Sequence, residues 1–151
     1  MTALTLALDD LAATEALGGR VARALRRGDA VLLAGALGAG KSALARAILR
    51  ALLGDPALAV PSPTFTLLQP YDSPIGTVSH FDLWRLDGAG PEVSGAVLEL
   101  GWDEAREGVV LVEWPDRLGV LTPQDALTIT LVPAGEDARV ATISGWGGRA
   151  L

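Results

Sequence analysis

Cysteine is absent from this chain of 151 residues, and histidine and lysine each occur once, as His80 and Lys41. The lack of cysteine excludes disulfides, thiolate zinc sites and iron–sulfur clusters, and it fits a reducing cytoplasm. A single histidine excludes a metal site built from several histidines. No apolar run approaches the ~20 residues of a membrane span, and the first residues lack the basic segment of a secretory signal. The sequence therefore predicts a cytoplasmic protein without membrane contact.

Positive charge is also scarce, since the net charge is −6. The arginines are scattered, with only Arg26 and Arg27 adjacent, and form no basic stripe. Autonomous binding of nucleic acid depends on neutralising phosphates with basic side chains, so this distribution disfavours it. A role near RNA would need a partner that supplies the basic surface. With 50% hydrophobic and 20% charged residues, residues 1–151 are expected to fold as a single domain.

The one lysine lies in a phosphate-binding motif. Residues 35–42 read GALGAGKS and match G-x-x-x-x-G-K-[ST], the P-loop. The apolar run 30–34 before it predicts a buried strand, and the apolar residues at every fourth position of 44–52 predict a helix. A compact ammonium at position 41 suits point contact with terminal phosphates. The residues expected to bind the nucleotide here are Ala36, Leu37, Gly38, Ala39, Gly40, Lys41 and Ser42.

A second continuous apolar run, 109–112, predicts another central strand, and it ends in Glu113. Nucleotide hydrolysis at a P-loop needs an acidic residue at the end of a neighbouring strand to hold Mg²⁺. Ser42 would bind Mg²⁺ through its hydroxyl, and Glu113 would complete the coordination directly or through water. The alternative for Glu113 is a solvated carboxylate without a function.

The segment 80–85, HFDLWR, is a further cluster of chemically active side chains. On a strand, His80 and Asp82 point to the same face, which sets the only histidine beside a carboxylate. Asp82 is the better catalytic candidate, as a ligand of Mg²⁺ or as the group that orients the attacking water. His80 is as plausible in a structural role as in a catalytic one. Arg85 is either a charge stabiliser or a partner in a surface salt bridge.

The hydroxyl-rich segment Ser62–Thr66, bounded by prolines, lies where a phosphate-sensing switch would follow the P-loop helix. Thr64 is the nucleotide-contact candidate in it. Segments of this composition are also common as plain loops. Trp114 is suited to stacking on a base or a partner, although a tryptophan at the end of a buried strand more often belongs to the core.

The remaining segments complete an α/β pattern. A first helix is expected to start at Asp9 or Asp10 and to end before Gly28. The other expected elements are a hairpin of strands 64–69 and 77–84 with a turn at 71–76, a helical segment 91–106, and antiparallel strands 127–131 and 140–144. Together they predict a P-loop NTPase-like mixed sheet with a parallel centre, antiparallel additions and flanking helices.

Four motifs in this order resemble the TsaE family, the small P-loop ATPases of bacterial tRNA threonylcarbamoyladenosine biosynthesis. The motifs are GALGAGKS at 35–42, SPTFTL at 62–67, HFDLWRL at 80–86 and EWP at 113–115. The P-loop is generic, whereas the other three in sequence are quite specific. Ala36, Ser42 and Trp84 depart from the family pattern, which has an acidic residue or Asn, Thr and Tyr at these places.

The resemblance implies an ATP hydrolase that is slow without partners and uses ATP and Mg²⁺. It implies action with a TsaD–TsaB-like protein complex to modify adenosine 37 of tRNAs that read ANN codons, with tRNA contacted only through the partners. It gives Lys41, Ser42 and Glu113 the ATP and Mg²⁺ roles and puts Asp82 in the catalytic site.

Three alternatives stay open at this point. A small P-loop metabolite kinase would need an acceptor subdomain and an arginine-rich lid, for which the chain has little room. A GTPase would need a lysine outside the P-loop to read guanine. A non-catalytic, nucleotide-gated interaction module would fit the departures at Ala36 and Trp84. The adenine pocket is the least defined part, and its candidates are Asp10, Leu11 or Thr14 on the first helix and residues near Arg139.

Overall fold

The computed structural model describes residues 3–87, 90–146, 149 and 151. The strands are β1 (Leu4–Leu8), β2 (Ala30–Ala34), β3 (Leu68–Ser73), β4 (Gly76–Asp82), β5 (Val109–Glu113), β6 (Leu127–Pro133) and β7 (Arg139–Ser144). The helices are α1 (Leu11–Ala24), α2 (Lys41–Leu53), α3 (Pro91–Glu99), α4 (Trp102–Ala105) and the 3-10 helix η1 (Pro115–Leu121). Within the described residues, no helix is both long and apolar enough to cross a membrane.

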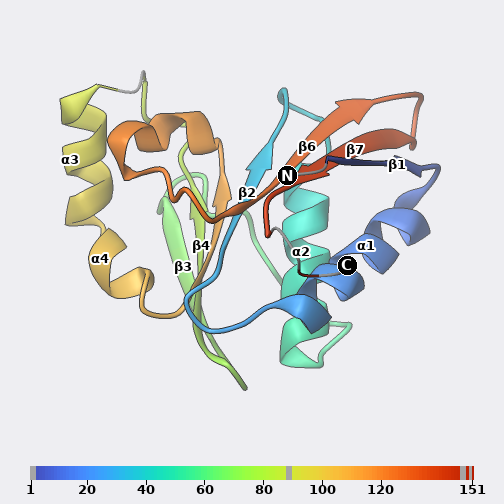
Figure 1. The fold of residues 1–151 in the computed structure, drawn as a ribbon, viewed down its shortest axis with the longest axis horizontal. Coiled ribbons are helices and arrows are strands. Elements are labelled where there is room, and N and C mark those ends of the chain that lie inside the picture. Colours follow the sequence, from blue (N-terminus) through green and yellow to red (C-terminus); the bar gives the residue numbers. More distant parts are fainter. Residues whose placement is uncertain (1–2, 88–89, 147–148, 150) are drawn as a thin grey trace.

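The strands form one mixed sheet in the order β1-β7-β6-β2-β5-β4-β3 (Figure 1). At its centre β2 runs parallel to β5 and β6, and β4 runs parallel to β5. Antiparallel pairs extend the sheet on both sides, through β7 and β1 at one edge and β3 at the other. The predicted fold class is confirmed. Because β2, β4 and β5 are parallel, their carboxyl ends lie together along one side of the sheet, across the strand direction. Ligands bind at the carboxyl ends of the strands in open α/β sheets.

Each face of the sheet carries its own apolar core. Val31 and Leu33 of β2 face α1 and α2, whereas Ala30 and Leu32 face α3, α4 and η1. Figure 1 shows these two groups of helices on opposite sides of the central strands. Since a strand alternates its side chains between faces, a continuous apolar run is what burial on both faces requires. The runs at 30–34 and 109–112 were correctly assigned to central strands for this reason.

The first helix is also confirmed at its start, because the Oδ1 atom of Asp10 accepts a hydrogen bond of 2.9 Å from the backbone N–H of Ala13. The P-loop helix ends at Leu53, and the next residue, Gly54, caps it with a φ of 68°, the left-handed conformation common after a helix C-terminus. These local predictions rested on capping chemistry, which the sequence displays directly.

The hairpin is present, but its boundaries were predicted wrongly. β3 spans Leu68–Ser73 rather than 64–69, so Tyr71 lies in the strand and not in the turn. The strand cannot start earlier because Leu67 has a φ of 68°, outside the extended region. The preceding residues form a turn, closed by a hydrogen bond from the Leu67 N–H to the Pro63 carbonyl.

The segment 91–106 was predicted as one helical stretch and is two helices. Gly101, with a φ of 96°, separates α3 from α4. Two further elements were not predicted at all. β1 pairs with β7, and the alternation of leucine at positions 4, 6 and 8 was the overlooked indication of it. The 3-10 helix η1 begins at Pro115, a residue that favours the first position of a helix.

Candidate nucleotide-binding site

The P-loop forms the connection between β2 and α2. Gly35 has a φ of 146°, and a Cβ atom there would lie 2.6 Å from the carbonyl oxygen of Leu131. Gly40, with a φ of 102°, directly precedes Lys41, the first residue of α2. Glycine adopts such angles without steric cost, so the backbone turns tightly into the helix. The free N–H groups and the positive end of α2 then suit the binding of an anionic group such as phosphate.

Lys41 lies across this loop. Its Nζ atom donates hydrogen bonds to the carbonyl oxygens of Gly35, at 2.6 Å, and Ala36, at 2.9 Å, and lies 3.9 Å from the centre of the Trp114 ring. Burial lowers the pKa of Lys41 from its ordinary value, and the negative charges of Glu113, Asp82 and Asp116 act against that shift. Burial is the larger effect, so the net shift of the Lys41 pKa is downward despite the nearby carboxylates.

Glu113 is brought to the P-loop by the sheet. β5 lies beside β2, and Glu113, the last residue of β5, pairs in register with Leu33. The Oγ atom of Ser42 donates a hydrogen bond of 2.9 Å to Oε1 of Glu113. Glu113 is buried, with 2% of its surface exposed. The predicted neighbourhood of Ser42 and Glu113 is present, and Glu113 is not a solvated strand-end carboxylate.

Asp82 ends the next strand, β4, and pairs in register with Glu113. Its Oδ2 atom accepts hydrogen bonds of 3.0 Å from both Ser62 Oγ and Thr64 Oγ1. Its Oδ1 atom accepts one of 3.1 Å from the backbone N–H of Trp84. The carboxylate thus holds the hydroxyl-rich segment 62–66 against the carboxyl end of the sheet.

His80 is on the same strand face as Asp82, but its partner is a different carboxylate. The Nε2 atom of His80 lies 2.7 Å from Oε2 of Glu113, and both residues are almost fully buried. Sequence reasoning set His80 beside Asp82 because the two are near in the chain. It could not show that β5 lies next to β4, which makes Glu113 the nearer carboxylate for the ring.

A cavity of about 370 Å³ lies where these elements meet. It is lined by Leu37, Gly38, Gly40, Lys41, Ser42, Ala43, Ser62, Thr64, Asp82, Trp84, Glu113 and Trp114. Most of the residues predicted to bind nucleotide or to act in catalysis are therefore gathered around one space. Ala36 and Ala39 do not line it, and both take part in the loop through their carbonyl oxygens.

Leu11 lies outside this cavity. It lines a neighbouring hollow of about 160 Å³ together with Thr14, Gly40, Ala43, Leu131, Asp137 and Arg139. The two spaces share Gly40 and Ala43, so the hollow adjoins the P-loop from the side of α1 and β7. This places Leu11, with Thr14 and Arg139, next to the cavity at the P-loop rather than within it.

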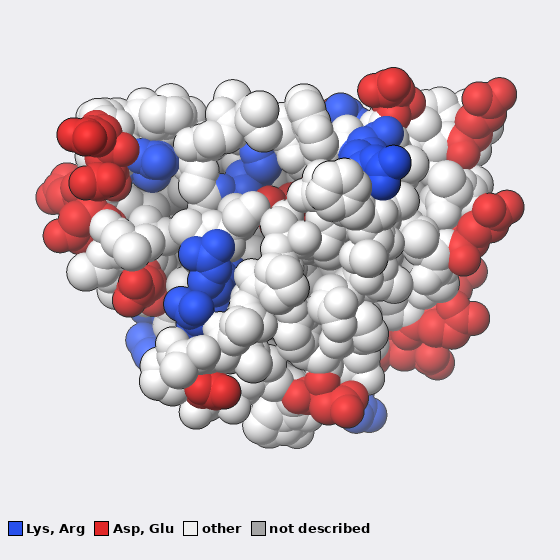
Figure 2. Space-filling model, turned by 180° about the vertical axis from the view of Figure 1, so that it is seen from behind, with Lys and Arg blue, Asp and Glu red and all other residues white. Residues whose placement is uncertain are grey.

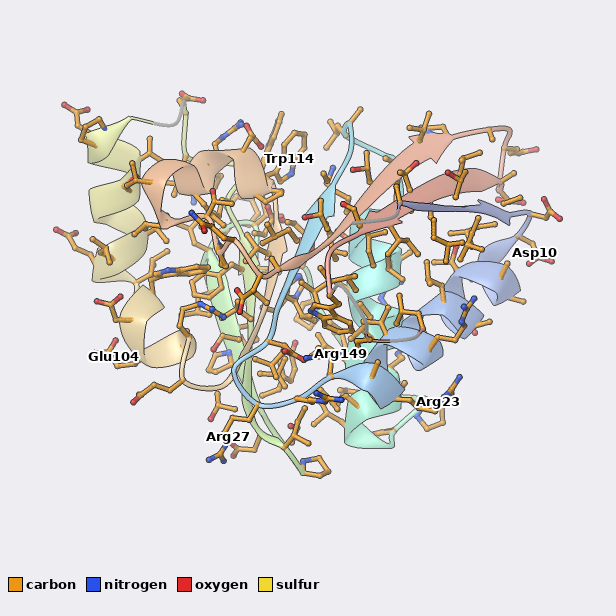
Figure 3. All side chains as sticks on the ribbon, viewed as in Figure 1. Asp10, Arg23, Arg27, Glu104, Trp114 and Arg149 are labelled. Carbon is orange, nitrogen blue, oxygen red and sulfur yellow. The ribbon has the colours of Figure 1, made fainter. Side chains whose placement is uncertain are left out.

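Two contacts of the site were not predicted from the sequence, although residues near Arg139 were among the candidates for the adenine pocket. Arg139, at the start of β7, donates a hydrogen bond of 2.9 Å from Nε to the carbonyl of Ala39 in the P-loop. The rings of Trp84 and Trp114 contact each other, with centres 4.7 Å apart and planes inclined at 40°. Trp114 has a φ of 61°, which is unfavourable for a residue other than glycine. Figure 3 shows Trp114 at the end of the sheet opposite to Arg27. The contact of Arg139 depends on strand order, so the sequence holds no local indication of it.

The residues at the mouth of the P-loop fit Mg²⁺. A hydroxyl oxygen of Ser42 and a carboxylate oxygen of Glu113 already lie within hydrogen-bond distance, and Mg²⁺ prefers oxygen ligands. Among the described residues, no group of three or more histidine, aspartate or glutamate side chains is placed to hold a metal. One or two protein ligands, with phosphates and water filling the other positions, is how Mg²⁺ is usually held beside a nucleotide.

Known proteins resemble the chain over most of its length. The sequence model of the family described as "Threonylcarbamoyl adenosine biosynthesis protein TsaE" matches residues 8–141. The protein named tRNA threonylcarbamoyladenosine biosynthesis protein TsaE in Rickettsia felis is 35% identical over 91% of this chain and 78% of its own. The protein of the same name in Bacillus subtilis is 33% identical, covering 90% of this chain and 82% of its own.

The fold has a solved counterpart as well. The crystal structure of YdiB from Bacillus subtilis superposes with a TM-score of 0.75 at 27% identity, covering 95% of this chain and 86% of YdiB. The family match extends from β1 into β7 and so includes the P-loop, Asp82 and Glu113. The chain therefore belongs to the TsaE family of threonylcarbamoyl adenosine biosynthesis proteins.

Proposed function

We propose that this chain is a Mg²⁺-dependent ATP hydrolase that supports the threonylcarbamoylation of adenosine 37 in tRNAs reading ANN codons. The observation that carries the proposal is the hydrogen bond between Ser42 of the P-loop and Glu113 at the end of β5. Both residues line the same cavity as Lys41. A P-loop alone would support nucleotide binding. A strand-end carboxylate bonded to the P-loop hydroxyl supplies the further group that hydrolysis requires.

Lys41 and the N–H groups of residues 36–42 bind the β- and γ-phosphates. Ser42 and Glu113 would hold Mg²⁺, which would supply positive charge to the phosphate oxygens. Asp82 accepts a hydrogen bond from the attacking water and orients it toward the γ-phosphate. Its present partners are the hydroxyls of Ser62 and Thr64, so orientation of water requires part of this hydrogen bonding to be exchanged.

The hollow beside Leu11 would hold the adenine ring, since it adjoins the P-loop cavity at Gly40. Leu11 and Leu131 provide apolar contact there, and Thr14 and Asp137 provide polar atoms. A cavity next to the phosphate loop with a few polar groups is the usual form of a nucleoside pocket.

Partner proteins control turnover through the segment Ser62–Thr66. Phe65 in its middle is 83% exposed, and Arg85 donates a hydrogen bond to the Phe65 carbonyl. The segment is thus fixed to the site at Asp82 and presents an apolar side chain to its surroundings. A TsaD–TsaB-like complex that contacts this surface would shift the segment and release Asp82 for the reaction. Hydrolysis is therefore slow without the partner.

The tRNA is reached only through that partner. On the face seen in Figure 2, acidic side chains gather toward both ends, and the basic side chains form separate small groups. The net charge of −6 adds a long-range repulsion for a polyanion. This distribution suits a subunit that acts in the cytoplasm by docking on a protein.

The test is ATP hydrolysis by the purified chain, alone and with a TsaD–TsaB pair and tRNA. We expect a slow basal rate that rises with the partners and is abolished by Lys41→Ala. Arg23→Ala serves as the control that removes one positive charge elsewhere, since Arg23 is an exposed residue of α1 on the far side from Trp114 (Figure 3). Tight ATP binding without hydrolysis under either condition would contradict the proposal and favour a nucleotide-gated module. Phosphate transferred to a small molecule would favour a kinase.

A further inference from the structure

His80 is buried and bonded, yet it has no place in the reaction as proposed. It is 1% exposed, and its Nε2 atom contacts Oε2 of Glu113. The Glu113 carboxylate accepts only, so the ring must carry its hydrogen on Nε2. The other nitrogen, Nδ1, is buried and has no hydrogen-bond partner among the described residues. The ring therefore makes one directed contact, and that contact is with a residue of the P-loop site.

The two oxygens of Glu113 are held by different donors. Oε1 accepts from Ser42 Oγ at 2.9 Å, and Oε2 accepts from His80 Nε2 at 2.7 Å. The two donors come from α2 and β4, and β5 lies between β4 and β2, the strand that leads into α2. With both oxygens held, the carboxylate has one orientation about its last torsion angle, and Oε1 is the oxygen presented to the P-loop.

We infer that His80 is the positioning residue of the metal site: its Nε2–H fixes Glu113 so that Oε1, next to Ser42, faces bound Mg²⁺. This inference rests on the proposed role of Ser42 and Glu113. Without the His80 donor, Oε2 would be a buried carboxylate oxygen without a partner, which is costly. The carboxylate would turn to recover a hydrogen bond, and Oε1 would leave its place beside Ser42.

His80 does not serve Asp82 in the same way, although both are on one face of β4. The oxygens of Asp82 are held by Ser62, Thr64 and the N–H of Trp84. Loss of His80 should therefore weaken the binding of metal and leave the attachment of the segment 62–66 unchanged. Partners that orient a metal ligand typically change metal affinity by about 10- to 100-fold when they are removed.

The experiment compares His80→Leu with His80→Gln. Leucine removes the donor, whereas the amide nitrogen of glutamine can take the place of Nε2. Binding of Mn²⁺ in the presence of a non-hydrolysable ATP analogue is measured by electron paramagnetic resonance, and affinity for the analogue alone is measured in EDTA. We expect His80→Leu to lose Mn²⁺ affinity by about 10- to 100-fold with its metal-free nucleotide affinity kept. His80→Gln should retain most of the Mn²⁺ affinity.

Wild-type Mn²⁺ affinity in folded His80→Leu would overturn the inference, and so would an equal loss in His80→Leu and His80→Gln. If His80→Leu does not fold, His80→Asn takes its place, because its amide nitrogen corresponds to Nδ1 and cannot reach Glu113. The metal loss is then expected in His80→Asn and not in His80→Gln. Failure of the proposed metal site is distinguishable, since the unaltered chain would then show no nucleotide-dependent Mn²⁺ binding at all. Failure of hydrolysis alone would appear in the phosphate-release test and would leave Mn²⁺ binding in place.

Discussion

Two buried carboxylates end adjacent parallel strands at the same edge of the sheet, and they are held in different ways. Glu113 of β5 is bonded to Ser42 of α2 and to His80 of β4, which belong to regular elements on both sides of it. Asp82 of β4 is bonded to Ser62 and Thr64, which belong to an irregular segment.

This difference separates a fixed half of the site from an adjustable half. Movement of Glu113 would require the sheet or α2 to shift, and both are part of the close-packed core. Movement of the Asp82 side chain requires the exchange of bonds from Ser62, Thr64 and the N–H of Trp84, which all lie outside the helices and strands. We therefore expect Glu113 to govern metal binding, and Asp82 to govern the rate at which bound ATP is hydrolysed.

Glu113→Ala is the change with the largest expected effect. It removes the carboxylate from the fixed half, so the partner-stimulated rate of ATP hydrolysis should fall on the order of 10³-fold. The measurement is phosphate release with partners present, and Asp103→Ala on α4 is the matched control for loss of an exposed carboxylate. A near-normal rate in Glu113→Ala would show that the metal site is assigned to the wrong residue.

Asp82→Asn keeps the shape of the side chain and removes its charge. The hydroxyls of Ser62 and Thr64 can still donate to the remaining amide oxygen, so the segment should stay in place. Orientation and activation of water should suffer, with hydrolysis reduced by about 10²-fold. Single-turnover measurement of phosphate release separates this step from binding. Unchanged hydrolysis with weakened metal binding would reverse the roles given to the two carboxylates.

Ser62→Ala deletes one of the two hydroxyl contacts to Asp82. A hydrogen bond to a charged group contributes about 1.5–3 kcal/mol. Its loss should raise the fraction of molecules in which the segment 62–66 is detached from Asp82 by roughly tenfold or more. If the segment restrains Asp82, the basal rate without partners should rise while the stimulation by partners shrinks. A fall in both rates would indicate that Ser62 acts in the reaction itself.

Trp84→Tyr is expected to have the smallest effect. Its backbone N–H still donates to Asp82, and the smaller ring still contacts Trp114, so only part of an aromatic contact of about 0.5–1.5 kcal/mol is lost. The melting temperature should drop slightly, and hydrolysis should stay within a few-fold of the unaltered chain. A large loss of activity would mean that the tryptophan contacts the nucleotide or partner directly.

The fixed half was largely predictable from the sequence. The P-loop, the buried run before it and Glu113 after the second buried run are local patterns, and parallel strands bring their carboxyl ends together. The bond between Ser42 and Glu113 follows from that arrangement. The contact of His80 with Glu113 could not be predicted in this way. The two residues are 33 positions apart in the chain, and they meet only because β4 lies next to β5 in the sheet.

The adjustable half was predicted less well for a physical reason. Residues 64–67 have the hydroxyl, aromatic and leucine content of a strand, and a strand was expected from 64. Contacts of Ser62 and Thr64 with Asp82 turn the backbone there, and β3 begins at Leu68. Tertiary hydrogen bonds of this kind outweigh the local preference for a strand, and the local sequence gives no indication of them.

The most direct test is the increase in ATP affinity that Mg²⁺ produces, measured by calorimetry in Glu113→Ala and Asp82→Asn side by side. The account predicts that Glu113→Ala binds ATP in EDTA as the unaltered chain does and gains nothing from Mg²⁺, whereas Asp82→Asn keeps the full gain. A full gain in Glu113→Ala, or an equal loss in both variants, would contradict the division of the site into a metal-binding and a water-orienting carboxylate.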